Sequence, residues 1–371
     1  MLNRDFSQCR RIVVKAGTTT LTSQDGNFSF ARLEQLGEEI LSLRQKRKEA
    51  VLVSSGAIAR GMEVLSLVKR PREMARLQAC AAIGQGKLIH DYERFFSRKD
   101  IHTAQILLTR DGLESRDRFL KARKTFQELL KMKMLPIVNE NDTVATEEIK
   151  FGDNDVLSVH VAHLVHADLL ILLSDVDGFY LKDGSRVRQV SSVQEIEQDL
   201  VKHLRDRRKA KNVGGMRAKL EAAKVAMRLG IPMLIVDGGT PGVLEKVMNH
   251  EDIGTLFAPV RERPNARKKW IAFSAPRKGT VGVDEGAYRA LKGEKRSLLA
   301  SGVRSVSGAF ERGSVVELET DRGYVFGRGV SRYAQDELKK VMGKSTQEIQ
   351  SLLGAETPHV VIHRNDLVVW G

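Results

Sequence analysis

The sequence is poor in cysteine and contains no long hydrophobic run. Its 371 residues include only two cysteines, Cys9 and Cys80. Because two cysteines without CxxC spacing cannot form a disulfide framework, we expect two reduced thiols without a role. No apolar run approaches the roughly 20 residues of a membrane-spanning helix, and the opening residues MLNRDFSQCRR hold no apolar segment of signal-peptide length. We therefore expect a cytoplasmic protein without membrane contact.

Acidic residues are fewer than basic ones, and the excess of basic residues is confined to one part of the chain. The chain carries 61 Lys and Arg against 47 Asp and Glu, a formal net charge of +14. Residues 279–371 hold 13 basic and 12 acidic side chains, so residues 1–278 hold 48 and 35, a net charge of +13. Any electrostatic attraction for anionic partners therefore resides in the first three quarters of the chain.

Apolar segments alternate with helical patterns over the first 260 residues. Strands are predicted at 11–15, 50–54, 103–108, 134–139, 168–174 and 232–237. Helices are predicted at 29–48, 71–98, 116–133, 154–166 and 215–229. Continuous rather than alternating apolar strands indicate that both faces of the sheet are covered. The sequence therefore predicts a layered α/β domain with a mainly parallel sheet.

The pattern changes in the last third of the chain. Residues 263–278 contain Pro264, Pro276 and a basic run, which is typical of a linker. Short strands and glycine-rich turns follow, with helical pieces near 285–293, 334–342 and 345–353. We expect an α/β domain over 1–262, a linker over 263–278, and a small, mostly β domain over 279–371.

The first candidate anion site follows the strand predicted at 11–15, where the chain continues as KAGTTT. Glycine lets backbone N–H groups approach a phosphate, and Lys15 supplies a fixed positive charge. The chain has no GxxxxGK[ST] sequence, so this is not a Walker A loop. Alone, the pattern is equally typical of a solvated lysine at a strand end.

Two further segments have the same character. In VLVSSGAIARG, Ser55 and Gly56 open a helix after a strand. A hydroxyl group there either caps the helix or contributes to an anion site. In NVGGMRAKLEAA, two glycines precede a helix that carries Lys219, again an arrangement suited to phosphate.

Acidic and amide side chains are concentrated in NENDTVATEEIKFGDNDVLS, residues 139–158. The strand before this segment delivers Asn139 and Asp142 to the carboxyl edge of the sheet, where open α/β sheets bind ligands. Such side chains can hold an α-ammonium group and orient lysines. A polar turn with a helix cap at Asp153 or Asn154 explains the pattern equally well.

Ser174 and Asp175 follow another predicted strand. With them, five such signals fall at strand ends of one sheet, and we expect them to converge. His160, His163 and His166 are spaced by three residues on a predicted helix, so they fan across a face without an obvious fourth ligand. We therefore assign no metal-ligating residue.

Together these segments resemble the amino-acid kinase family, and within it the glutamate kinases. The resemblance covers nearly the whole chain. It is carried by VVKAGT, SSGAIARG, QILLTR, VNENDTVATEEIKFGDNDVLS, LLSDVDGFY, GGMRAKLEAA, VGVDEGA and GVSRY. It implies an amino-acid kinase-like three-layer sandwich followed by a PUA-like domain. It also implies ATP-dependent phosphorylation of the γ-carboxylate of L-glutamate to L-glutamyl 5-phosphate, the first step of proline biosynthesis.

The resemblance also implies roles for individual residues. Lys15 and Lys219 would contact the transferring phosphoryl group, and Asp155 would organise the two lysines. The residues implied to hold glutamate are Ser55, Asp142 and Asn154. The residues implied to line the ATP site are Lys15, Gly17, Ser174, Asp175, Val213, Gly214, Gly215, Met216, Arg217, Ala218 and Lys219. The family further implies Mg²⁺ with the nucleotide, a homo-oligomer, and proline as a feedback inhibitor.

The chemistry agrees with this interpretation. A glutamate γ-carboxylate, with an unperturbed pKa near 4.3, is already an ionised nucleophile at neutral pH, so no general base is required. The reaction instead needs positive charge to bring two anions together. One departure concerns the ATP loop, where RRKAKN precedes Val213 at a position that is commonly threonine in the family. A hydroxyl contact to the nucleotide would be lost there.

Two alternatives stay open. Sibling kinases act on acetylglutamate, aspartate, carbamate or nucleoside monophosphates, although the block at 139–155 favours glutamate. Because PUA domains resemble RNA-binding modules and the chain is basic, an RNA-binding or RNA-modifying factor is the alternative from a different class. The nearly neutral residues 279–371 count against it, since positive charge should lie on the binding module, so we do not expect a nucleic-acid partner.

Overall fold

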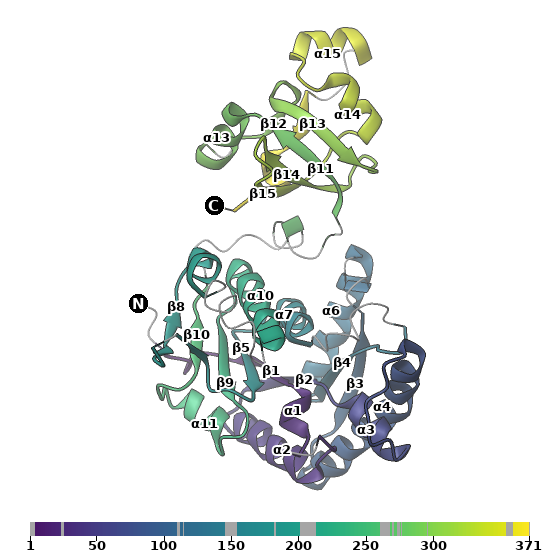
Figure 1. The fold of residues 1–371 in the computed structure, drawn as a ribbon, viewed down its shortest axis with the longest axis vertical. Coiled ribbons are helices and arrows are strands. Elements are labelled where there is room, and N and C mark those ends of the chain that lie inside the picture. The colour runs from purple at the N-terminus through teal and green to yellow at the C-terminus, as the bar shows by residue number, and fades with distance from the viewer. Residues whose placement is uncertain are drawn as a thin grey trace. The chain divides into compact units, whose positions relative to one another are not determined.

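The structure is a computed structural model of the whole chain. It describes all residues except 1–3, 24–25, 110–111, 114, 145–153, 182, 201–212, 260–267, 269–270, 273–274, 276, 295, 354–358 and 371. The chain divides into two compact units (Figure 1). The larger comprises Met1–Leu113 and Asp117–Arg263, and the smaller comprises Glu114–Arg116 and Pro264–Gly371. The functional boundaries expected at 262/263 and 278/279 stay predictions.

An eight-stranded sheet forms the larger unit. Its strands are β1 (Arg11–Ala16), β2 (Glu49–Ser54), β3 (Thr103–Leu108), β4 (Leu135–Glu140), β5 (Leu169–Ser174), β8 (Gln189–Val190), β9 (Met233–Asp237) and β10 (Thr255–Phe257). The spatial order is β3-β4-β2-β1-β5-β9-β10-β8. The first six run parallel, whereas β10 is antiparallel to β9. The mainly parallel sheet is confirmed, and its six predicted strands lie within one residue of their expected bounds.

Helices connect these strands. They are α1 (Thr18–Leu21), α2 (Phe30–Gln45), α3 (Ala57–Val64), α4 (Met74–Phe96), α6 (Arg116–Lys131), α7 (Asn154–Leu164), α8 (Val193–Glu195), α10 (Val213–Leu229) and α11 (Val243–Met248), with short turns η1 (Ser97–Lys99) and η3 (Ile196–Leu200). The five helices predicted from periodicity all occur. The short helices α1 and α11 were not predicted, because four to six residues are too few to show helical periodicity.

The two faces of the sheet are covered by different helices. Successive strand residues point to opposite faces, so Ile12, Val14 and Ala16 pack into one hydrophobic core with side chains of α2, α4 and α11. The alternate residues of β1 point to the opposite face, where Lys15 meets α7. Figure 1 shows α7 and α10 side by side over the sheet and α2 and α11 on its other side. This layering decides which helix supplies partners for Lys15.

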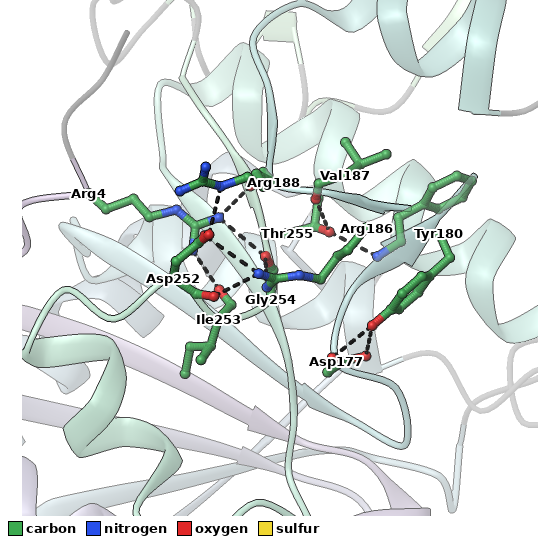
Figure 2. A network of polar contacts seen from close by, with 11 residues as sticks. Arg4, Asp177, Tyr180, Arg186, Val187, Arg188, Asp252, Ile253, Gly254 and Thr255 are labelled. Carbon is green, nitrogen blue, oxygen red and sulfur yellow. Dashed lines mark hydrogen bonds and ion pairs between the residues drawn. The ribbon is translucent and has the colours of Figure 1, made fainter. Parts of the chain in front are cut away.

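A hairpin of β6 (Phe179–Tyr180) and β7 (Arg186–Val187) follows β5. Three guanidinium groups converge on the Asp252 carboxylate beside it: Arg4 at 3.1 Å, Arg186 at 3.5 Å and Arg188 at 2.7 Å (Figure 2). Tyr180 donates its hydroxyl hydrogen to Asp177 at the start of the hairpin, 2.8 Å away. The cluster ties the N-terminal segment and the hairpin to the β10 end of the sheet.

The smaller unit is mostly β, as predicted. Its five-stranded sheet has the order β13-β11-β14-β15-β17, and a two-stranded sheet pairs β12 with β16. The elements are β11 (Arg277–Val283), α13 (Glu285–Gly293), β12 (Leu298–Leu299), η4 (Ala300–Gly302), β13 (Val303–Gly308), β14 (Val315–Thr320), β15 (Val325–Val330), α14 (Gln335–Val341), α15 (Thr346–Leu353), β16 (Val360–Ile362), η5 (Arg364–Asp366) and β17 (Leu367–Val369). The three predicted helical pieces correspond to α13, α14 and α15.

The smaller unit has its own core, in which Phe310, Phe326 and Tyr333 are buried. Two residues of the expected linker, Ile271 and Ala275, are also buried against its β14 strand. Among the described helices of the whole chain, none combines the length and apolar character needed to span a bilayer.

Candidate active site

The carboxyl ends of the central parallel strands meet at one edge of the larger sheet. Strand pairing sets Ala16 of β1 beside Ser54 of β2, and Ser174 of β5 beside Asp237 of β9. Four of the five polar signals therefore fall at this edge, as expected. The fifth signal, the segment from Val213 to Lys219, forms the first two turns of α10, and the residues directly before it are outside the described ones, so its place at a strand end stays a prediction.

Two lysines share one carboxylate behind this edge. Asp155, the second residue of α7, forms ion pairs with Lys15 of β1 and with Lys219 of α10, the latter at 3.2 Å. The side chains of Lys15, Asp155 and Lys219 are 5%, 4% and 14% exposed. The three residues predicted to be catalytic are thus in contact, although 204 positions of sequence separate the two lysines. The cluster carries two positive charges and one negative charge, a net charge of +1.

The surroundings of Asp155 favour the ionised form of its carboxyl group. Burial by itself would raise its pKa, but the charges and hydrogen bonds of Lys15 and Lys219 outweigh burial and hold the pKa below its ordinary value. An ionised carboxylate between two ammonium groups offsets their mutual repulsion and fixes their direction. The cluster of Lys15, Asp155 and Lys219 is positively charged and largely shielded from water. Such a cluster is suited to stabilising an anionic group while that group is transferred.

The ammonium group of Lys15 lies close to Gly17, which has no side chain to obstruct it. A Cβ atom on Gly17 would lie 3.3 Å from the Lys15 Nζ atom. The backbone of Gly17 has φ −74°, which any residue can adopt. A side chain at this position would therefore be constrained by the close approach of the ammonium group, which would have to shift by a few tenths of an ångström, and not by backbone conformation.

Neutral amides form the neighbouring part of the site. The Asn154 Nδ2 atom lies 2.9 Å from Ser55 Oγ, 2.9 Å from Asn139 Oδ1 and 3.2 Å from the Ser54 carbonyl oxygen. All four residues are buried, and they come from α7 and from the ends of β2 and β4. The Asn154 carboxamide donates across the sheet edge rather than accepting from a helix N–H group. The alternative in which Asn154 only caps α7 is therefore wrong, and Asp153 lies outside the described residues.

Asp142 lies in the turn after β4 and is half-buried. Burial raises its pKa to about 6, and the Arg70 guanidinium offsets this only in part. In the portion of the chain that the structure describes, Asp142 has no hydrogen-bond or ion-pair partner. A carboxyl group in this condition gains the most from a cation that arrives with a ligand.

The residues predicted for the nucleotide lie on the β5 and α10 side. Ser174 donates its hydroxyl hydrogen to Asp175 at 3.1 Å, and Asp175 is exposed. Residues 213–218 begin α10, and among them Gly215 and Arg217 are exposed. The basic run at 202–211 is outside the described residues, and most of the one at 261–278 is too.

Metal ligands are not gathered anywhere in the described ranges: no group of three or more His, Cys, Asp or Glu side chains there could hold a metal ion. His160 and His163 are buried within α7. The strongest feature that sequence reasoning missed is Gln85 of α4, which accepts a hydrogen bond from Asn139 at 2.8 Å. A glutamine in the middle of an amphipathic helix gives no sequence signal of such a role.

Comparison with known proteins places both units. Residues 10–237 match the model of the amino acid kinase family, and residues 279–353 match the model of the PUA domain. A glutamate 5-kinase of Caldanaerobacter subterraneus subsp. tengcongensis is 42% identical over 362 residues, which cover 97% of this chain and 97% of the relative. The glutamate 5-kinase of Carboxydothermus hydrogenoformans is 43% identical over 364 residues, with the same coverage of both chains. That of Syntrophotalea carbinolica is 43% identical over 367 residues and 98% of each chain.

Solved structures also align with the chain. UMP kinase from Bacillus anthracis has a TM-score of 0.46 at 19% identity, covering 67% of this chain and 96% of that one. Carbamate kinase from Giardia lamblia has a TM-score of 0.47 at 16% identity, covering 68% and 99%.

Proposed function

Because the chain belongs to the amino acid kinase family, and within it to the glutamate 5-kinases, we propose that it transfers the γ-phosphoryl group of ATP to the γ-carboxylate of L-glutamate. Full-length relatives named glutamate 5-kinase, at 42–43% identity, support this proposal. The reaction is the first step of proline biosynthesis. Its products are ADP and L-glutamyl 5-phosphate.

One observation supports the proposal most directly. Asn154 and Asp155 are adjacent in the chain, yet one joins the amide cluster and the other joins the lysine cluster. A ligand that spans both clusters would carry an ammonium or carboxylate group at one end and a phosphate acceptor at the other. Glutamate has this construction, with its γ-carboxylate as the acceptor.

The transfer needs alignment and charge rather than proton removal. A γ-carboxylate oxygen of glutamate attacks the γ-phosphorus atom, the bond from that phosphorus to the bridging oxygen breaks, and ADP leaves with the electron pair. Lys15 and Lys219 neutralise charge on the transferring group, and Asp155 holds the two ammonium groups at a fixed spacing. No residue accepts a proton, since the nucleophile is already ionised at neutral pH.

The other end of glutamate is held by Ser55, Asp142 and Asn154. The Asn154 Nδ2 atom donates its hydrogens to acceptors of the protein. Its Oδ1 atom can therefore accept a hydrogen bond from the α-ammonium group of glutamate. Asp142 supplies the opposing negative charge, and the Ser55 hydroxyl donates to the α-carboxylate. A carboxylate beside a buried amide cluster recognises an ammonium group by charge as well as by hydrogen bonding.

ATP lies on the side of β5 and α10. We assign its binding to Gly17, Ser174, Asp175 and residues 213–219, with the N–H groups of the first turn of α10 directed at phosphate. Mg²⁺ usually keeps several waters and binds through substrate phosphates. Bound there, it would neutralise phosphate charge.

Four finer statements complete the proposal. The enzyme acts in the cytoplasm, where ATP is available. It forms a homo-oligomer, and proline inhibits it as the end product. The kinase domain spans 1–262, the linker 263–278, and the PUA-like domain 279–371.

The test is ATP turnover together with hydroxylamine trapping of the acyl phosphate, using glutamate, aspartate, acetylglutamate and UMP. We expect a trapped product with glutamate alone. Asp142→Ala should weaken the response to glutamate while leaving ATP binding intact, and Lys219→Ala should abolish the product. Folded wild-type protein that yields no glutamate-dependent product would end the proposal.

A further inference from the structure

A side chain outside the predicted site reaches the amide cluster from a different layer of the fold. Gln85 lies in α4, and its Oε1 atom accepts a hydrogen bond of 2.8 Å from Asn139 Nδ2. Asn139 in turn accepts from Asn154 Nδ2 at 2.9 Å. Three carboxamide groups from α4, β4 and α7 therefore form one chain of hydrogen bonds that ends at the glutamate side of the site.

One backbone N–H group determines which carboxamide donates and which accepts in this series of hydrogen bonds. The N–H group of Glu140 donates to Asn139 Oδ1 at 2.9 Å, and a backbone N–H can only donate. Asn139 therefore cannot exchange its oxygen and nitrogen positions. Its Oδ1 atom must face Glu140 and Asn154, and its Nδ2 atom must face Gln85, which has to present an oxygen.

The same logic extends to Asn154. Because Asn139 presents an acceptor, Asn154 must present its Nδ2 atom, which also serves Ser55 Oγ. The orientation of the Asn154 carboxamide is thus set by Asn139, and Asn139 is locked on its far side by Gln85. A reversed Asn139 would set two NH₂ groups against each other in a buried place, which is unfavourable by roughly 1–3 kcal/mol per unsatisfied group.

The helix that carries Gln85, α4, packs against α3 with the two backbones in contact. A Cβ atom on Gly84, the residue before Gln85, would overlap the Ala57 carbonyl oxygen of α3. A Cβ atom on Gly61 of α3 would overlap the Cys80 carbonyl oxygen of α4. The two backbones are therefore in direct contact at Gly84 and again at Cys80, about one turn earlier in α4, and α3 itself begins directly after Ser55 and Gly56. Gln85 is presented from a rigid support.

We propose that Gln85 is a positioning residue for the amino-acid substrate, acting through Asn139 to hold the Asn154 carboxamide with its oxygen toward the α-ammonium group. This inference rests on the proposed function. It predicts that Gln85 governs glutamate affinity and leaves ATP binding and phosphoryl transfer unchanged, because Gln85 hydrogen-bonds to Asn139 of the amide cluster, whereas Lys15 and Lys219 are held by their ion pairs with Asp155.

Two substitutions separate a hydrogen-bond role from mere space filling. Gln85→Met keeps the length of the side chain but removes the acceptor, whereas Gln85→Glu keeps an acceptor oxygen at the same distance. Gln127→Met, at an exposed position of α6, is the matched control for the same change of residue. Initial rates of hydroxylamine-trapped product are measured with glutamate and ATP varied separately.

We expect Gln85→Met to raise the KM for glutamate about ten-fold, the effect of one lost buried hydrogen bond, with kcat and the KM for ATP within about two-fold of wild type. Gln85→Glu should restore the KM for glutamate to within about three-fold of wild type, and Gln127→Met should match wild type. Glutamate should also raise the Tm of wild type and of Gln85→Glu more than that of Gln85→Met.

The contrary results are distinct. An unchanged KM for glutamate in Gln85→Met, beside an active wild type, overturns the role of Gln85 alone. Equal losses in Gln85→Met and Gln85→Glu, or parallel changes in the KM for ATP, also overturn it and leave Gln85 as a packing residue. A wild type that forms no glutamate-dependent product overturns the function and the inference together.

Discussion

The two halves of the site are stabilised by different physics. At one end, the buried Lys15 and Asp155 and the partly buried Lys219 are formal charges that sum to +1. At the other end, Asn139 and Asn154 are neutral amides whose order follows from hydrogen-bond direction. A charged cluster can respond to the charge that moves between ATP and the acceptor, whereas a neutral cluster can only hold a group in place. The charged end is therefore the part that should control kcat, and the amide end the part that should control KM.

Removing a charge from the lysine end gives the largest expected effect. We expect Lys219→Ala to lower kcat about 10³-fold, comparable to the loss of a charge-stabilising donor in other transfer enzymes, with little change in the KM for glutamate. Trapped acyl phosphate at saturating substrates measures it. Lys224→Ala is the control, because Lys224 lies on the same helix and also pairs with a carboxylate, Glu221, at 3.0 Å. A comparable loss in both variants would show that α10 packing, rather than the Lys219 charge, is responsible.

The next effect concerns Asp155, whose two partners make it a determinant of stability as well as of rate. We expect Asp155→Asn to lower kcat about 10²-fold and to lower the free energy of unfolding at pH 7 by about 3 kcal/mol, because the buried ammonium group of Lys15 and the partly buried one of Lys219 lose the negative charge between them. Chemical denaturation and steady-state kinetics measure the two quantities.

The pH dependence of stability tests whether the ion pairs of Asp155 stabilise the folded protein. The folded pKa of Asp155 is below its ordinary value, so its contribution to stability is present above the unfolded pKa of about 3.9 and is lost as pH falls through the folded pKa. The stability difference between wild type and Asp155→Asn should therefore be constant from pH 5 to 7 and shrink below about pH 4. A difference that grows toward acid would contradict the ion-pair account.

The same contrast explains what the sequence could predict. Lys15, Ser55 and Asp155 each follow a recognisable strand end or helix start, so a local pattern identifies them. The charge that Asp155 shares with Lys219 depends on α10 packing against α7, which no local pattern encodes. Gln85 is a still harder case, because its role depends on the glycine contact between α3 and α4 and on the direction of one N–H group. Strand positions were predictable from apolar runs, whereas the order of the strands and the reversal of β10 were not.

Asp142 should have a smaller effect, on the KM for glutamate. Its pKa is raised, whereas that of Asp155 at the lysine end is lowered. The pKa of Asp142 is raised to about 6 by burial, so the carboxylate that attracts the α-ammonium group is lost as pH falls below 6. We expect the KM for glutamate to rise about ten-fold from pH 7 to pH 5 in wild type, while both carboxylates of glutamate stay largely ionised. Asp142→Asn should show a high KM that is nearly flat with pH, and Asp117→Asn, an exposed carboxylate on α6, should behave as wild type.

Stability should move in the opposite direction at this residue. A carboxyl group whose pKa is raised by folding destabilises the native state above that pKa, and the penalty disappears as pH falls below its unfolded pKa. Asp142→Asn should therefore have a higher Tm than wild type at pH 7 and a similar Tm near pH 4. A lower Tm of Asp142→Asn at pH 7 would mean that Asp142 has a favourable partner within the protein, and its proposed role in holding an ammonium group would lose its basis.

The smallest effect tests how finely the lysine end is positioned. Gly17→Ala leaves the backbone unstrained at φ −74° and adds one methyl group 3.3 Å from Lys15 Nζ. The ammonium group must move by a few tenths of an ångström, which we expect to lower kcat about five-fold, since transfer depends on the alignment of the groups around phosphorus. Gly293→Ala, which meets open space in α13, should leave kcat unchanged. If Gly17→Ala instead raised the KM for glutamate at constant kcat, the separation between a rate-setting charged end and an affinity-setting amide end would fail.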